Sequence, residues 1–173
     1  MDVVDSSTRS LMMSSIRGKN TLPERQVRSY LHGAGLRFRL HSAGLPGKPD
    51  LVLPRYRAVI MVHGCFWHRH GGCRFCTTPA TRPEFWHQKF ARNVQRDAEK
   101  EAELQGLGWT VFTVWECETS DELALDQLFW RIVALAEERG DDLGDHKRRR
   151  AARLNGVSAI SPKSEGVVIR DKY

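Results

Sequence analysis

The segment HGCFWHRHGGC, residues 63–73, constrains the fold of this chain more than any other stretch. It places Cys65, His70 and Cys73 within nine residues, and zinc takes four tetrahedral ligands from cysteine sulfur and histidine nitrogen. Cysteines in a cytoplasmic chain of this size are more typical of metal ligands than of disulfides. The fourth ligand is either Cys117, at the end of TVFTVWEC, or Cys76, which forms a CRFC pair with Cys73. The segment therefore predicts a bound metal ion.

Composition and charge add three expectations about domain, partner and location. The 173 residues, 40% of them hydrophobic, favour a single domain over residues 1–140 with a helical arm at about 5–20. The net charge of +6 favours a polyanionic partner. Residues 141–173 form a polar basic tail that either contacts phosphates or is simply solvated. No stretch has the apolar length that spans a bilayer, so we expect a cytoplasmic protein without membrane contact.

Two capping boxes predict where helices begin. The stretch TLPE at residues 21–24 has a hydroxyl and, three residues later, a carboxylate, and it opens a helix that ends near Gly33. The stretch TRPE at residues 81–84 repeats the pattern and opens a long helix to about Gln105. A final helix is expected over residues 120–139. We expect the long helix to turn an apolar ridge inward, made of Phe90, Val94, Ala98 and Ala102.

Four segments predict strands. Residues 36–40 alternate apolar and basic side chains, as a half-exposed strand does. Residues 51–53 and 58–62 predict an antiparallel pair, and the second of them is apolar on both faces, which favours a central position in the sheet. Residues 110–115 form a further strand. Together with the helices, these strands predict an α/β fold.

Asp50, His63 and His68 remain available for chemistry once the metal ligands are assigned. An aspartate can hold a hard cation such as Mg²⁺ through oxygen, while a neutral histidine takes a proton from water. Hydrolysis of a phosphodiester needs both functions. A lone histidine is more often a packed or surface residue, and an aspartate after a turn can simply begin a strand. The three residues together, at neighbouring strand ends, favour a catalytic site.

Several motifs follow one another at consistent spacing over residues 8–117. They are TRS at 8–10 with Met13 and Ile16, Glu24, LPGKPD at 45–50, VHGCFWHRHGGC at 62–73, TRPEFW at 81–86, residues 93–97, LGW at 107–109 and VWEC at 114–117. In this combination the chain resembles the very short patch repair endonucleases, which nick DNA beside a thymine mispaired with guanine.

This resemblance implies a fold similar to the restriction-endonuclease core, a mixed sheet flanked by helices, with an added structural zinc site. It implies an endonuclease that nicks one strand 5′ to the thymine of a G·T mispair by Mg²⁺-dependent hydrolysis and so begins repair of deaminated 5-methylcytosine. A cytosine-5 methyltransferase and mismatch repair proteins are the functional partners that it implies. Recognition of a single mismatch needs no two-fold symmetry, so we expect a monomer.

The same resemblance implies roles for individual residues. Asp50 matches the aspartate that binds the catalytic magnesium ion, and His68 matches the general base. His63 and Glu24 match residues that assist them. Zinc would be held by Cys65, His70, Cys73 and Cys117.

Three residues or motifs depart from that pattern or have a second explanation. Val62 stands where a well-studied pattern has a threonine, so only its backbone carbonyl could bind the magnesium ion. The Glu-x-Lys that usually completes a restriction-type site is missing, and His63 and His68 would replace it. Glu24 closes a capping box, so a structural and a catalytic role are equally open.

The adjacent rings of Phe66 and Trp67 lie among the predicted metal ligands, although a zinc site has no need of them. Apolar side chains pushed between bases test how easily a base step opens, at a cost that is lower where pairing is poor. We interpret the two rings as such a wedge in a surface loop, joined by Trp86, rather than as core residues. The resemblance places Met13 and Ile16 on the opposite, minor-groove side.

Two other functions compete with that of a nicking enzyme. A zinc-stabilised DNA-binding module explains the charge and the metal ligands but leaves Asp50, His63 and His68 without a role. A zinc-dependent nucleobase deaminase is excluded, because the sequence has neither His-x-Glu nor Pro-Cys-x-x-Cys.

Overall fold

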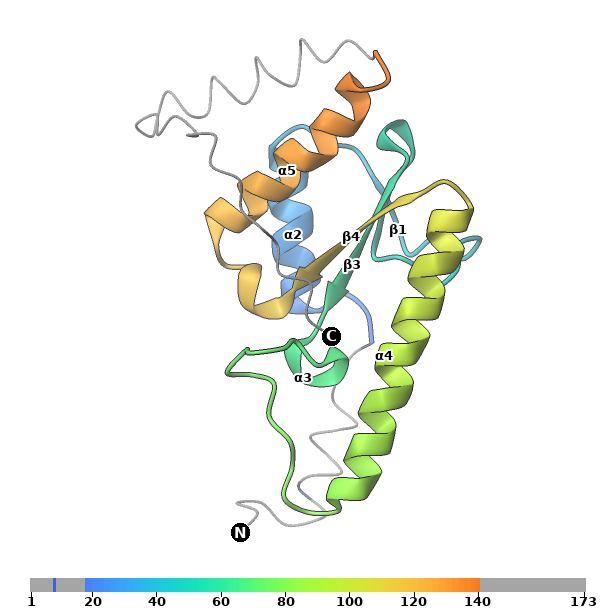
Figure 1. The fold of residues 1–173 in the computed structure, drawn as a ribbon. Coiled ribbons are helices and arrows are strands. Elements are labelled where there is room, and N and C mark those ends of the chain that lie inside the picture. Colours follow the sequence, from blue (N-terminus) through green and yellow to red (C-terminus); the bar gives the residue numbers. More distant parts are fainter. Residues whose placement is uncertain (1–7, 9–17, 141–173) are drawn as a thin grey trace.

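Four strands form one mixed sheet in the computed structural model, which describes Thr8 and residues 18–140. The strands are β1 (Arg39–Leu40), β2 (Leu51–Leu53), β3 (Ala58–His63) and β4 (Thr110–Trp115), in the order β1-β2-β3-β4 (Figure 1). The first two pairs of neighbours are antiparallel, and β3 and β4 are parallel. The predicted central place of residues 58–62 is confirmed. The first strand is shorter than the predicted 36–40.

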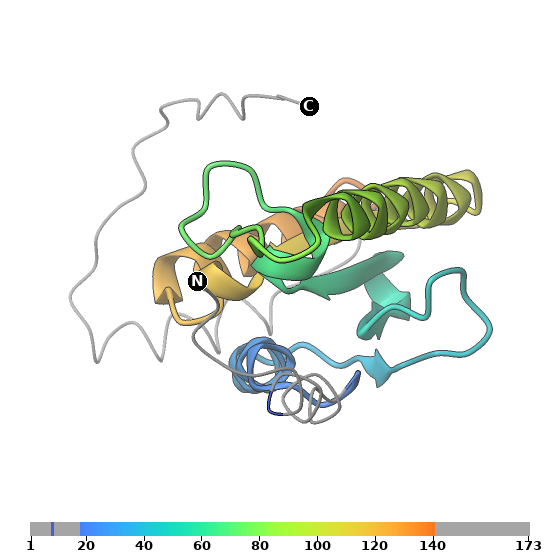
Figure 2. The ribbon, with the colours of Figure 1, turned by 90° about the horizontal axis from the view of Figure 1, so that it is seen from below.

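Helices cover both faces of this sheet. They are α2 (Leu22–Gly33), the short α3 (Cys65–His68), α4 (Pro83–Gly106) and α5 (Glu122–Glu137). Two 3₁₀ turns, η1 (Pro54–Tyr56) and η2 (Glu116–Glu118), follow β2 and β4. Figure 2 shows α2 and α4 on opposite sides of the sheet.

The alternation of side chains along β3 and β4 separates two apolar clusters. Ile60, Phe112 and Val114 point to the face where α2 and α5 pack and form the larger cluster with Leu31 and Phe129. On the other face a smaller cluster joins α4 to the sheet, made of Val52, Val59 and Leu104 with Leu45, Met61, Trp109 and Val111 packed against them. The sheet therefore has one strongly apolar face, whereas the face under α4 leaves room for polar side chains.

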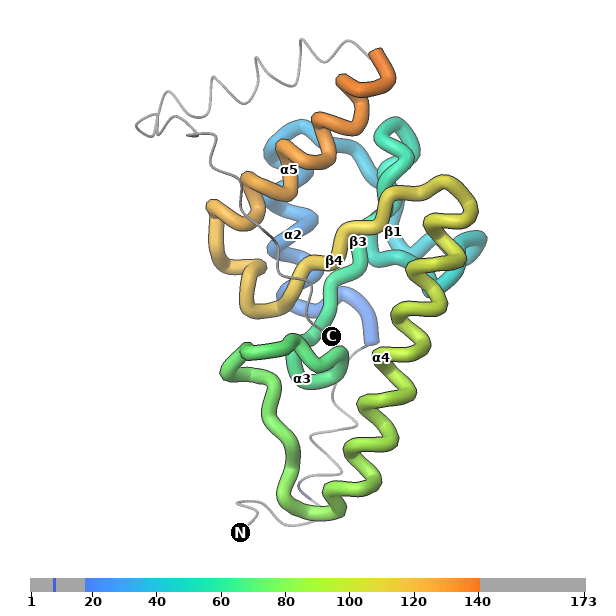
Figure 3. The backbone as a smooth tube through the Cα atoms, in the orientation of Figure 1, coloured from blue at the N-terminus to red at the C-terminus, as the bar shows by residue number. Residues whose placement is uncertain are grey.

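The two predicted capping boxes have different outcomes. Thr21 caps α2 as predicted, because its hydroxyl accepts from the Glu24 N–H and the Glu24 carboxylate accepts from the Thr21 N–H. At residues 81–84 the predicted helix is confirmed, because α4 runs from Pro83 to Gly106, but the predicted capping box is wrong, since the N-cap is Arg82, in a left-handed conformation with φ of 55° and no side-chain cap bond. Residues 69–82 form a long connection from α3 to the N-terminal end of α4 (Figure 3). At Arg82 the chain changes direction and enters the helix.

The predicted inward ridge of α4 is also wrong, apart from Phe90. Val94 is 45% exposed, and Ala98 and Ala102 are exposed as well. The residues that face the domain are Trp86, Phe90 and Leu104, with half-buried Asn93 and Asp97 between them. The middle of α4 thus borders a polar cleft instead of the core.

Some predictions fall outside the described residues. The tail at 141–173 lies wholly outside them, and the helical arm at about 5–20 lies outside them except for Thr8 and residues 18–20. Within the described part of the chain, no helix is long and apolar enough to cross a membrane.

Candidate active site and metal centre

The metal-ligand group is built where the parallel strands β3 and β4 end side by side. His63 is the register partner of Trp115, so Cys65 and Cys117 each follow two residues beyond a paired position. The His70 Nδ1 atom lies 3.7 Å from Cys65 Sγ and 3.3 Å from Cys117 Sγ. A tetrahedral zinc ion requires sulfur and nitrogen ligands to lie about 3.6 Å apart, given its usual bond lengths. The geometry therefore fits a zinc ion.

The fourth member of this group is Cys117. The ligand atoms of Cys65, His70, Cys73 and Cys117 all lie within 4.8 Å of one another, whereas Cys76 does not belong to this group. The His70 ring stacks on Trp115 at 4.3 Å and 3°, which fixes the orientation of the imidazole. Burial and the neighbouring Cys65 and Cys73 thiols raise the pKa of Cys117 to about 12. A bound metal ion would lower the pKa of Cys117 again, because metal ligation favours the thiolate.

Asp50 immediately precedes β2, and its carboxylate reaches the neighbouring strand. Its Oδ2 accepts a hydrogen bond from the Val62 backbone N–H at 2.7 Å. Burial raises the pKa of Asp50, the Val62 N–H lowers it, and the negative charge of Glu24 raises it further. The carboxylate is therefore held in a setting that disfavours its charge, as expected for a group that meets a cation.

His68 and His63 lie together beside α4. The His68 Nδ1 atom is 2.5 Å from Asp97 Oδ2, and the rings of His63 and His68 stack at 4.0 Å and 11°. Because the carboxylate accepts, Nδ1 of His68 carries the proton and Nε2 remains free to take another. Asn93 holds the same corner by donating from Nδ2 to the Trp67 carbonyl at 3.1 Å. The arrangement is suited to accept a proton from water.

His63 has a different electrostatic setting from its neighbour. Burial, followed by the charge of His68, lowers the pKa of His63 to about 4, while Asp97 acts in the opposite direction. The His63 imidazole is therefore neutral at pH 7 and contributes its shape and its nitrogen atoms, not a positive charge.

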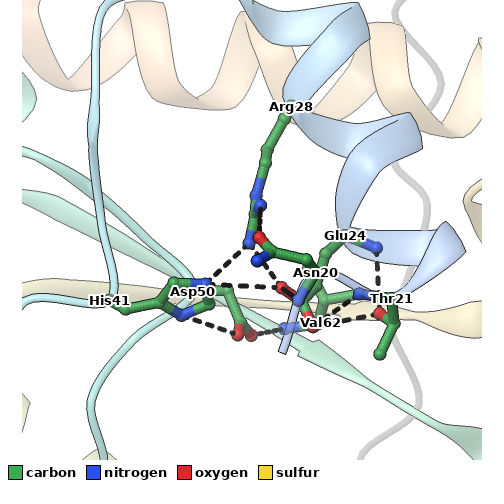
Figure 4. Close-up of polar contacts among 7 residues, drawn as sticks. All are labelled: Asn20, Thr21, Glu24, Arg28, His41, Asp50 and Val62. Carbon is green, nitrogen blue, oxygen red and sulfur yellow. Dashed lines mark hydrogen bonds and ion pairs between the residues drawn. The ribbon is translucent and has the colours of Figure 1, made fainter. Parts of the chain in front are cut away.

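Glu24 is buried beside Asp50, and four groups donate to its carboxylate. Oε2 accepts from the Asn20 N–H at 3.0 Å and forms an ion pair with Arg28. Oε1 accepts from the Thr21 N–H at 3.3 Å and from the Thr21 hydroxyl at 3.0 Å. Figure 4 shows these contacts together with His41, whose ring lies between Arg28 and Asp50.

The carboxylates and imidazoles of Glu24, His41, Asp50, His63, His68 and Asp97 line one cleft of about 930 Å³. It extends from the first turn of α2, past the strand ends and α3, to the middle of α4. Its lining residues include Lys19, Glu24, His41, Asp50, Val62, His63, Trp67, His68, Arg96, Asp97 and Lys100. The aspartate and the histidine pair that the sequence predicted therefore face the same space.

Sequence reasoning missed Asp97 and His41. Asp97 belongs to a motif that carried the family resemblance, and Asn93 and Asp97 stand one helical turn apart on the face defined by Phe90 and Leu104. That spacing could have indicated from the sequence that Asp97 faces the domain. His41 follows β1 as an isolated histidine with φ of 46°, and nothing in the sequence around it indicates its place beside Asp50.

Phe66, Trp67 and Trp86 meet in an aromatic cluster with Phe90. Phe66 lies 4.9 Å from Trp67, 5.6 Å from Trp86 and 5.1 Å from Phe90, measured between ring centroids. Phe66 and Trp67 are half-buried in α3, so the predicted surface loop is a short helix here, and Trp86 is 8% exposed. The Lys89 ammonium lies 4.9 Å above the Trp67 ring. Met13 and Ile16 lie outside the described residues.

Fold and site together define an α/β protein with a mixed sheet, a four-ligand cysteine and histidine group and a cleft that combines carboxylates with imidazoles. Such a combination can bind metal ions and move protons.

Comparison with known proteins defines the family. Residues 1–74 match the family model "DNA mismatch endonuclease Vsr". The chain is 50% identical over 132 residues to the type II nicking enzyme V.XorIIP of Xanthomonas oryzae pv. oryzae, covering 76% of this chain and 96% of that one. It is 50% identical over 116 residues to the DNA mismatch endonuclease Vsr of Escherichia coli K12, covering 67% and 74%. The chain belongs to the Vsr family of DNA mismatch endonucleases.

Proposed function

We propose that this endonuclease nicks one DNA strand 5′ to the thymine of a G·T mispair by Mg²⁺-dependent phosphodiester hydrolysis, and thereby initiates very short patch repair of deaminated 5-methylcytosine. The observation that carries the proposal is the shared cleft, in which Asp50 and the pair of His68 and Asp97 face the same space. The mixed sheet with flanking helices supports a restriction-endonuclease-like core for this site.

Asp50 and the Val62 backbone carbonyl are the proposed ligands of the magnesium ion. Oxygen donors of this kind are those that Mg²⁺ prefers, and the burial of Asp50 makes a cation favourable there. Asp50 and the Val62 carbonyl would hold the ion, which would stabilise the negative charge that develops on the phosphoryl oxygens.

His68 is the proposed general base. Its Nε2 accepts a proton from the attacking water, while Asp97 holds Nδ1 and stabilises the imidazolium that forms. His63 assists as a neutral ring stacked on His68, which fixes the plane of the base.

Zinc is the proposed occupant of the group of Cys65, His70, Cys73 and Cys117. With all four positions filled by protein, the ion would have no open position for a substrate and would act structurally. The four residues would tie the ends of β3 and β4 to α3, which carries His68 and, from the aromatic cluster, Phe66 and Trp67. The zinc site would thus position the base and the DNA-contacting rings together.

The aromatic cluster is the proposed probe of base stacking. Phe66 and Trp67, supported by Trp86, would enter the mispaired step from one side, with Met13 and Ile16 on the minor-groove side. The partner is double-stranded DNA with a G·T mismatch, bound by a monomer. A cytosine-5 methyltransferase and mismatch repair proteins are the expected functional companions, and action on cellular DNA supports a cytoplasmic location.

A nicking assay tests the proposal. A duplex with one G·T mispair, labelled separately on each strand, is incubated with and without Mg²⁺, beside a matched G·C duplex. We expect one Mg²⁺-dependent nick 5′ to the mispaired thymine, none in the matched duplex, and none with Asp50→Asn, which should still bind the mismatch within about tenfold of wild type. Tight mismatch binding without any nick would instead favour a non-catalytic DNA-binding module.

A further inference from the structure

Arg28 lies between Glu24 and His41, two residues that line the cleft. Its side chain is 12% exposed, and its Nη2 atom forms the ion pair with Glu24 and lies 3.0 Å from His41 Nε2. Its Nη1 atom donates to Asn20 Oδ1 at 2.5 Å. The Arg28 guanidinium of α2 thus contacts both the buried Glu24 carboxylate and the His41 imidazole, as Figure 4 shows.

The contact with Arg28 determines which nitrogen of His41 carries the proton. A guanidinium is always charged and has donors only, so His41 Nε2 must accept and the neutral imidazole carries its proton on Nδ1. That Nδ1 lies 3.9 Å from Asp50 Oδ1. A ring shift of about 1 Å would bring the two atoms to hydrogen-bonding distance. Asp50 is consequently approached by N–H groups from two sides, Val62 at Oδ2 and His41 at Oδ1.

Glu24 has no free acceptor position for a metal ion. An ionised carboxylate offers about four lone-pair positions. The two N–H groups of Asn20 and Thr21, the Thr21 hydroxyl and the Arg28 guanidinium already take four. A cation bound to Glu24 would also stand beside the fixed positive charge of Arg28.

We propose that Arg28 and His41 are positioning residues for Asp50. Glu24 fixes the Arg28 guanidinium, Arg28 sets the tautomer and orientation of His41, and His41 orients the carboxylate that binds the metal ion. Glu24 therefore acts through Arg28 and is not itself a metal ligand. The inference rests on the proposed role of Asp50 in metal binding, and no other part of the proposed function is needed for it.

The competing arrangement is direct ligation by Glu24, His41 and Asp50, whose ligand atoms lie within 4.8 Å of one another. It requires Arg28 to leave, because Arg28 occupies the lone pair of His41 Nε2 and one oxygen of Glu24. The two arrangements predict different effects of replacing His41 by glutamine. A glutamine amide has both an acceptor for Arg28 and a donor for Asp50, so it can replace a bridging imidazole.

Direct metal binding tests the proposal without reference to nicking. Mn²⁺ is titrated into the zinc-loaded protein, and free Mn²⁺ is followed by electron paramagnetic resonance; the site is defined as the binding that Asp50→Asn removes. We expect His41→Ala and Arg28→Met each to weaken this binding by about tenfold, the usual effect of losing a residue that supports a metal ligand. His41→Gln should stay within about twofold of wild type. Zinc content and circular dichroism of each variant establish that it is folded.

Electron spin echo modulation of the bound Mn²⁺ separates the two arrangements even if one variant fails to fold. We expect the nitrogen modulation of wild type and His41→Gln to be the same, because His41 does not touch the metal. Loss of a nitrogen coupling in His41→Gln, or equal weakening by His41→Gln and His41→Ala, would overturn the proposal in favour of direct ligation. Unchanged affinity in both His41→Ala and Arg28→Met would overturn it too. A wild type that binds Mn²⁺ as expected but does not nick G·T duplexes would reject the proposed function alone.

Discussion

Asp50 is held where its negative charge is disfavoured, since burial is the main cause of its raised pKa. An uncharged isostere at this position should therefore stabilise the protein when no divalent cation is bound. We predict that Asp50→Asn raises the midpoint of thermal unfolding at pH 7 by roughly 2–4 °C, the shift that about 1 kcal/mol causes in a chain of this size. The measurement is calorimetry in buffer free of Mg²⁺ and of chelators, so that zinc is retained.

The pH dependence of the stabilisation by Asp50→Asn follows from the raised pKa of Asp50. Because the pKa of Asp50 is higher in the folded state, the folded protein binds more protons than the unfolded chain at pH values between 3.8 and the folded pKa. Stability of the wild type is lost as pH rises through this window, and the loss is complete above it. The advantage of Asp50→Asn should thus be full at pH 7 and vanish below pH 3.8. A gain that is independent of pH would argue against a desolvated charge.

In the proposed mechanism, His68 Nε2 takes the proton from water and Asp97 holds the imidazole ring through Nδ1. We predict that His68→Ala slows nicking by about a hundredfold or more and that Asp97→Asn slows it less, because general-base catalysis contributes roughly 10²–10⁴ in rate. Single-turnover kinetics on a G·T duplex measure both effects. Equal rates for wild type and His68→Ala would reduce His68 to a packing role.

Elements whose signals are local could be predicted from the sequence. The Thr21 cap joins groups three residues apart, and the apolar run at 58–62 can be buried only as an inner strand. The start of α4 at Pro83 was predicted as well, but its N-cap was not, because the conformation of Arg82 depends on where the preceding connection comes from. The prediction for the inner face of α4 was wrong because a helical spacing of apolar residues indicates the buried face only where the helix packs on a core. The middle turns of α4 border the cleft instead.

The proposed zinc site joins elements that are far apart in the sequence, since Cys117 follows β4 whereas the other three proposed ligands lie in and after α3. We predict that Cys117→Ala loses its zinc and destabilises the domain, whereas Cys76→Ala, the matched control, keeps about one zinc per chain, because a closed site needs all four ligands. Metal analysis of dialysed protein, together with thermal unfolding, provides the measurement. Zinc retained by Cys117→Ala and lost by Cys76→Ala would reassign the fourth ligand.

At the scale of the whole molecule, the cleft is assembled from segments that are distant in sequence. Asp50 and His63 could be predicted from the sequence because they stand at the ends of neighbouring strands, and His68 because it follows His63 in the same motif. His41 and the role of Asp97 could not be predicted, since each depends on how a loop or a helix packs across the cleft. The segment after β3 carries three of the proposed zinc ligands and the proposed base in or next to the helix that holds the aromatic cluster, so we expect recognition and cleavage to be physically coupled.

That coupling can be tested by removing the two rings of α3. We predict that Phe66→Ala with Trp67→Ala keeps its zinc and its salt-dependent binding to matched duplex, which comes from lysine and arginine contacts with phosphates. Each stacked aromatic contributes about 1–3 kcal/mol, so preference for a G·T duplex should fall on the order of tenfold or more, with a parallel loss of nicking. Phe75→Ala, which removes a ring that is 46% exposed and lies outside the aromatic cluster, is the matched control. It should change neither the preference for a G·T duplex nor the nicking rate.

A second measurement follows unstacking directly. Fluorescence of 2-aminopurine next to the mispair should rise with wild type and stay low with the double variant. Unchanged preference and unstacking in a folded, zinc-loaded double variant would assign both rings to packing and leave mismatch recognition to other groups.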